Sequence, residues 1–89
     1  MNQIQFPMID PFVMSLEPKQ QALKVLEEAS ELVEAVKTCD PNQEPLYEFA
    51  DVLQALGNLA ALMGWDKWKI AMAYQNVKQN NIERGRYEV

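Results

Sequence analysis

Apolar residues recur at three- and four-residue steps in several stretches of the chain, the pattern of helices with one apolar side. The first stretch runs from about Ser15 to Lys37, with Ser15 as the predicted N-cap and Pro18 in the first turn. A break containing Asp40-Pro41 follows it. No strand-like alternation competes, so the pattern predicts a helix. Its apolar stripe consists of Ala22, Val25, Leu26, Ala29, Leu32, Val33 and Val36.

Two further helices are predicted after the break. The second begins at residue 44 or 45 and ends near Met63, and Gly64 suits the left-handed position that ends a helix. Asp66 is a suitable N-cap for the third, which extends to about Glu83. Because the break between the first two helices is short, we expect them to form an antiparallel hairpin.

Residues 1–14 differ from the rest of the chain. They contain Phe6-Pro7 and Asp10-Pro11, and proline disfavours helix for the residue before it. We therefore expect an extended, largely apolar arm that packs against the domain or a neighbouring subunit. The predicted organisation is this arm followed by one all-α domain over residues 15–89, with three main helices.

Composition limits the partners and the chemistry. A chain of 89 residues with net charge −5 predicts one domain, shows no basic face for a nucleic-acid polymer, and is short enough that a partner subunit would help complete its core. The longest apolar stretch, Leu59 to Trp65, is too short for a membrane span, and no charged signal-peptide segment is apparent, so the cytoplasm is expected. With one cysteine and no histidine, acid–base or metal chemistry must use carboxylates.

Two pairs of acids have the spacing that such chemistry needs. Glu28 and Glu31 lie in the first predicted helix, and Glu48 and Asp51 lie in the second. A separation of three residues places both carboxylates of a pair on one face of a helix, about 4.5 Å apart along its axis. In a hairpin the two pairs can face each other, and hard oxygen ligands suit Mg²⁺ or Mn²⁺.

The two pairs differ in how far their surroundings support a site. Glu28 and Glu31 are also compatible with an ordinary solvated surface, with Lys24 one turn before Glu28. Glu48 and Asp51 have no nearby Lys or Arg in a helix that is apolar nearly all round, which predicts burial. Unpaired carboxylates in a buried helix are unfavourable unless they are protonated, paired or bound to metal.

The third predicted helix becomes polar and cationic towards its end. Lys78, Asn81 and Arg84 continue the side that carries its apolar stripe. They suit an anionic ligand such as a triphosphate, but they equally suit a helix that emerges into solvent, since late basic residues favour the helix dipole. Trp65 and Trp68, at the start of this helix, are expected to be packing residues.

The order Glu28-x-x-Glu31 then Glu48-x-x-Asp51 resembles the paired signature of MazG-type, all-α nucleoside triphosphate pyrophosphohydrolases. The tail from Lys78 to Gly85 is similar to the Lys/Asn/Arg motif that follows the acids in many members. The likeness extends over residues 23–86.

The resemblance implies hydrolysis of an NTP or dNTP between its α- and β-phosphates, giving a monophosphate and pyrophosphate. It implies that the four acids hold Mg²⁺, with Mn²⁺ as a possible substitute, and that one of them orients or deprotonates water. It also implies that the basic tail contacts the substrate, and that the hairpin completes a four-helix bundle in a homodimer or homotetramer. The residues concerned are Glu28, Glu31, Glu48 and Asp51 for metal and catalysis, and Lys78, Asn81 and Arg84 for substrate.

Two alternatives stay open. Phosphoribosyl-ATP pyrophosphohydrolase has a similar helical core, length and acidic pairs, although its usual C-terminal pattern differs from the tail of this chain. A helical oligomerisation module without activity would keep the fold and pair Glu48 and Asp51 with basic residues of another chain, such as Lys19 or Lys69.

Overall fold

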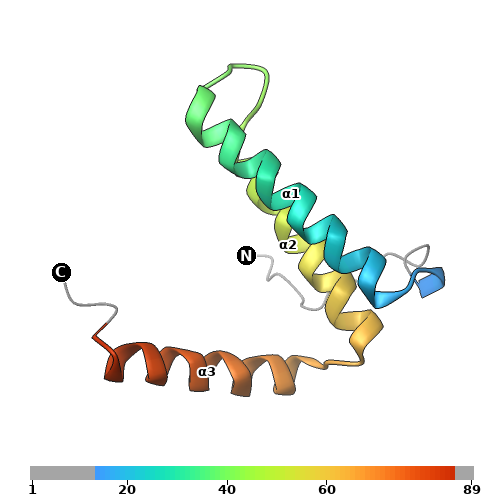
Figure 1. The fold of residues 1–89 in the computed structure, drawn as a ribbon, viewed down its shortest axis with the longest axis vertical. Helices are drawn as coiled ribbons and strands as arrows, with labels where there is room; N and C mark the ends of the chain where they lie inside the picture. Colours follow the sequence, from blue (N-terminus) through green and yellow to red (C-terminus); the bar gives the residue numbers. More distant parts are fainter. Residues whose placement is uncertain (1–13, 86–89) are drawn as a thin grey trace, which may run out of the picture.

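The computed structural model describes residues 14–85, and the predicted arm over residues 1–14 lies outside them except for Met14, which is in a short 3-10 turn. The described chain forms α1 (Pro18–Thr38), α2 (Pro45–Met63) and α3 (Lys67–Glu83), with no strand in this part. The all-α prediction is therefore confirmed. Figure 1 shows α1 and α2 side by side as an antiparallel hairpin, with α3 leaving the end of α2 at an angle.

The first helix begins later than the sequence suggested, because its N-cap is Glu17 and not Ser15. Glu17 has extended backbone angles, as expected for a residue before proline, and Pro18 occupies the first helical position. The Glu17 backbone N–H donates to Gln20 Oε1 over 2.9 Å, as half of a reciprocal capping arrangement. Proline thus fixes the start of α1 three residues after the predicted cap.

The other helix ends follow the predicted signals. Gly64 closes α2 in the left-handed region, at φ 74°, and Asp66 caps α3 by accepting from the Lys69 N–H over 2.9 Å. Glu44 caps α2 by accepting from the Leu46 N–H over 3.3 Å. Cys39 closes α1 at φ 53°, which is uncommon for a residue other than glycine. The predicted break, α2 and α3 are all confirmed.

The buried positions of the hairpin carry small and polar side chains. The only buried apolar residues in the described chain are Ala35, Ala55 and Ala60, and no large side chain is fully buried. Gln21 is 3% exposed, and its Nε2 donates to the Ala55 carbonyl of α2 over 3.0 Å. Small residues allow the two helices to approach closely, but they bury little apolar area and contribute little hydrophobic stabilisation.

The prediction that α2 is largely buried is wrong for the single chain. Several of its large apolar side chains are exposed, including Phe49 at 51%. Helical spacing places six of the exposed apolar residues of α1 and α2 on one side of the hairpin, and Glu31 and Asp51 on the other. We call the apolar side the hairpin face. It consists of Leu26, Val33, Val36, Leu46, Phe49 and Leu56.

The third helix is set apart from the hairpin. Extensive packing between helices joins only α1 and α2 in the described chain. Trp65 and Trp68, which were expected to pack, are 43% and 70% exposed. The tryptophan prediction is therefore wrong for the single chain, because no other described helix packs extensively against this region.

Candidate metal centre

Three of the predicted acids meet where the middle of α1 faces the first turn of α2. Glu28 of α1 and Glu48 and Asp51 of α2 each offer a carboxylate oxygen, and these oxygens lie within 4.8 Å of one another. Glu28 and Glu48 are half-buried, whereas Asp51 is exposed. The prediction that acids from two helices come together is confirmed.

The register of the hairpin explains this meeting. Gln21 of α1 contacts Ala55 of α2 through its side-chain hydrogen bond. Glu28 follows Gln21 by seven residues in α1, and Glu48 precedes Ala55 by seven residues in α2. Seven residues are close to two helical turns, so each acid lies on the same side of its helix as the bonded residue. Antiparallel pairing therefore places Glu28 opposite Glu48, each on the seam of its own helix.

The fourth predicted acid, Glu31, lies at the edge of the cluster. It is exposed, yet its carboxylate acts on both Glu28 and Glu48. The Glu31 backbone carbonyl accepts a hydrogen bond from Gln43 Nε2 over 3.3 Å, which ties the interhelical loop to α1 beside the acids. All four acids therefore gather in one region, which we call the acidic cluster: Glu28, Glu31, Glu48 and Asp51.

The charges of Glu31 and Asp51 oppose the ionisation of Glu28 and Glu48. Desolvation, followed by the charges of Glu31 and Asp51, raises the pKa of Glu48. Desolvation and the Glu31 carboxylate also raise the pKa of Glu28, and the charge of Lys24 offsets only part of that rise. Negative charge is thus concentrated here with little compensation from this part of the chain.

One oxygen of the cluster has no hydrogen-bond partner among residues 14–85. Glu48 Oε2 is a buried atom for which the structure provides no donor. A buried carboxylate oxygen without a donor is unfavourable, and a bound cation relieves both the missing contact and the repulsion between acids. Oxygen donors of this kind suit a hard divalent cation such as Mg²⁺. The residues present therefore fit the cation that the sequence predicted.

The predicted substrate-binding residues are not brought to the acids within one chain. Lys78 and Asn81 lie on α3, and Arg84 is its C-cap. Lys78 and Arg84 are exposed and Asn81 is half-buried. The helical spacing that puts these residues on one side of α3 is confirmed. Because α3 does not pack along the hairpin, their meeting with the acidic cluster stays a prediction.

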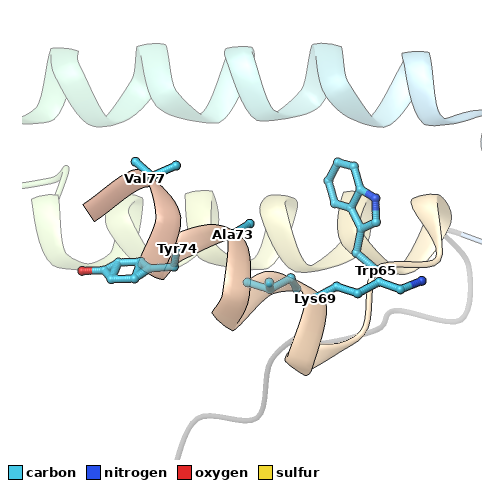
Figure 2. A pocket seen from close by; sticks show the side chains of 6 residues that line it. Trp65, Lys69, Ala73, Tyr74 and Val77 are labelled. Carbon is cyan, nitrogen blue, oxygen red and sulfur yellow. The ribbon is translucent and has the colours of Figure 1, made fainter. Parts of the chain in front are cut away.

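An apolar groove of about 590 Å³ runs along α3. Figure 2 shows Trp65, Ala73 and Val77 projecting from one side of this helix. The sequence predicted the stripe but not the contributions of Trp65 and Lys69, because Trp65 precedes the N-cap and falls outside the helical repeat. The groove is lined by Trp65, Lys69, Ile70, Ala73, Tyr74 and Val77.

Comparison with protein-family models, curated proteins and solved structures finds no match to this chain. In the described part, no helix is both long enough and apolar enough to cross a membrane.

Proposed function

We propose that the chain is a Mg²⁺-dependent nucleoside triphosphate pyrophosphohydrolase with the acidic cluster as its metal site. One observation carries the proposal: carboxylate oxygens of Glu28, Glu48 and Asp51 lie within 4.8 Å of one another. These acids come from two helices and share a half-buried seam. A bound cation would offset the repulsion between these acids and contact Glu48 Oε2, which is buried without a donor among the described residues.

Each acid has a role that its position supports. Glu28 and Glu48, on the seam, are held by the packing of both helices and would provide the fixed ligands. Asp51 and Glu31 are exposed and reach the same region, so they can contact a ligand or an attacking water. A bound Mg²⁺ would supply Lewis-acid chemistry, lowering the pKa of water and offsetting phosphate charge.

A triphosphate also needs cationic contacts, which the acidic cluster does not provide. Lys78, Asn81 and Arg84 are the residues proposed for that task. They follow the apolar groove along α3, so the same helix side offers an apolar surface and then cationic and amide groups. Assembly of the chain into an oligomer is the step proposed to bring α3 to an acidic cluster.

The hairpin face supports that assembly. Phe49, Leu26 and Leu46 are at least half exposed, while the seam holds no fully buried large side chain. Two such hairpins that pack face to face give a four-helix bundle with a larger apolar core. We therefore propose a homodimer or homotetramer built on the hairpin face, located in the cytoplasm with its nucleotide substrates.

A panel of NTPs, dNTPs and phosphoribosyl-ATP, assayed for pyrophosphate release with Mg²⁺ and with EDTA, tests the activity. We expect Mg²⁺-dependent release that Glu48→Gln abolishes. The matched control is Glu34→Gln, an exposed acid of α1 outside the acidic cluster. Turnover of phosphoribosyl-ATP alone would favour the alternative enzyme. No turnover together with no Mg²⁺ binding would leave the inactive oligomerisation module as the better description.

Sedimentation equilibrium tests the assembly separately. We expect an oligomer at micromolar concentration and a lower mass for Phe49→Glu, which places a charge in the hairpin face. Tyr47→Glu is the matched control, because Tyr47 is also an exposed aromatic but lies on the other side of α2. A wild-type monomer would contradict the four-helix bundle.

A further inference from the structure

The third helix has a second apolar patch on the side away from its groove. Trp68 and Met72 are 70% and 68% exposed, and their spacing of four residues places them one above the other. With Ala71, Gln75 and Asn76 they line a shallow depression of about 240 Å³. We call this side the outer stripe. A helix with apolar patches on two opposite sides needs two contacts to cover them, and the groove accounts for only one.

The two ends of α3 carry charges of both signs. Asp66 and Arg84, its two caps, agree with the helix dipole, whereas Lys67 and Lys69 in the first turn and Glu83 at the last helical position oppose it. An antiparallel neighbour of the same sequence offers these three residues groups of opposite charge. Its last turn, with Glu83, lies beside the first turn of α3, with Lys69.

We propose that α3 packs antiparallel against α3 of a second copy of this chain through the outer stripe. Placing Trp68 of one copy level with Glu83 of the other sets the two-fold axis between Gln75 and Asn76. Trp68 then lies beside Ile82 of the second copy, which is 50% exposed, and Lys69 lies on the same flank as the second copy's Glu83. The pairing brings exposed apolar side chains together and places opposite charges near one another at both ends.

The size of this contact defines what it joins. A helix of this length is about 25 Å long, and one pair of such helices buries less than the roughly 1,600 Å² of a typical stable interface. The α3 contact is therefore too small to hold two isolated chains. It joins oligomers that the hairpin face has already formed, and it turns a dimer into a tetramer.

Disulfide trapping tests the register directly, because Cys39 is the only cysteine of the chain. In full-length Cys39→Ser protein, Gln75→Cys places two thiols next to the two-fold axis, within the separation of about 7 Å between Cα atoms that a disulfide allows. Asn80→Cys is the control, because Asn80 is also exposed but lies off the outer stripe. We expect mild oxidation to crosslink chains at position 75 and not at position 80. Absence of the crosslink at position 75, or equal crosslinking at both positions, would overturn the proposal.

The mass of the assembly gives a second test that does not depend on disulfide chemistry. Met72→Glu adds a charge to the outer stripe, and Asn80→Glu adds the same charge outside it. We expect Met72→Glu to halve the sedimenting mass while helical circular dichroism and pyrophosphate release are retained, and Asn80→Glu to leave the mass unchanged. An unchanged mass for Met72→Glu would refute the contact. Loss of pyrophosphate release in every variant, including the wild type, would contradict the proposed function and leave the mass result standing.

Discussion

The Gln21 side chain of α1 donates to the backbone carbonyl of Ala55 in α2 over 3.0 Å, and this bond joins the two helices at a fixed register. The same register places Glu28, seven residues after Gln21, opposite Glu48, seven residues before Ala55. A buried amide between helices is satisfied in only one alignment, so it favours that alignment over a slipped one. The position of the acidic cluster is thus linked to a residue that has no part in its chemistry.

Gln21→Ala is expected to destabilise the hairpin by about 1–3 kcal/mol, because it removes the side-chain hydrogen bond to the Ala55 carbonyl and opens space at a buried position. The free energy of unfolding in urea measures the loss. Gln79→Ala is the control, since Gln79 is exposed and bonds only to exposed Glu83 among the described residues, and its effect is expected to stay within about 0.5 kcal/mol. Equal effects of the two substitutions would show that the Gln21 bond does not stabilise the seam.

Glu48→Gln is expected to stabilise the metal-free protein and to abolish its stabilisation by Mg²⁺. The neutral amide removes a charge that Glu31 and Asp51 repel, and it also removes a ligand. For the wild type, Mg²⁺ at 100 times its Kd is expected to add about 2.7 kcal/mol. Thermal unfolding with Mg²⁺ and with EDTA makes the comparison, and Glu34→Gln should keep the response to Mg²⁺. Equal Mg²⁺ responses of wild type and Glu48→Gln would remove Glu48 from the site.

The stability of the metal-free protein is expected to carry a pH dependence from the two seam acids. The folded state raises the pKa of Glu28 and of Glu48 above the ordinary value of 4.5, so it holds their protons more tightly than the unfolded state does. Below pH 4.5 both carboxyls are protonated in the folded and unfolded states, and they do not destabilise the fold. As the pH rises through the raised pKa values, ionising them in the folded state becomes unfavourable, which lowers the free energy of unfolding.

Thermal unfolding in EDTA, measured from about pH 4 to pH 7, tests this sign. The difference between wild type and Glu48→Gln isolates the contribution of Glu48 from the other titrating groups. We expect Glu48→Gln to gain stability relative to wild type as the pH rises, and excess Mg²⁺ to reduce that gain because the ion binds the charged form. A difference that shrinks with rising pH would contradict the repulsion within the acidic cluster.

Arg84→Ala is expected to raise KM or lower kcat while the fold is retained. One charged hydrogen bond to a phosphate contributes about 1.5–3 kcal/mol, which corresponds to a decrease of roughly ten- to a hundred-fold in kcat/KM. Steady-state pyrophosphate release measures it, with Lys19→Ala as a control at an exposed position of α1. An unchanged kcat/KM for Arg84→Ala would exclude this residue from the substrate site.

Gly64→Ala is expected to destabilise the chain by about 1 kcal/mol through backbone strain alone. Gly64 has φ +74°, and a Cβ at this position would meet no other atom within 4 Å. Gly64→Asn should cost less, because asparagine tolerates the left-handed region better than alanine does. Urea unfolding of the two variants compares them, and a larger loss for asparagine would contradict a purely conformational origin.

The sequence by itself determined the helices. Their ends depend on local chemistry, such as Pro18 and Gly64, and such signals act within a few residues of the chain. Even the misplaced cap at Ser15 has a local reason, the extended conformation of Glu17 before proline. The pairing of Glu48 with Asp51 was equally readable, because it depends only on helical spacing.

Only the tertiary structure decided what the helices face. The bond from Gln21 to Ala55 sets the register that unites Glu28 with Glu48, and no local pattern encodes a contact between residues 34 positions apart. The near-continuous apolarity of α2 suggested burial, yet Phe49 is exposed because the described part of one chain supplies only one helix that packs extensively against α2. Apolar periodicity indicates that one side of a helix needs to be covered by another element. The tertiary packing decides whether that element belongs to the same chain or to another one.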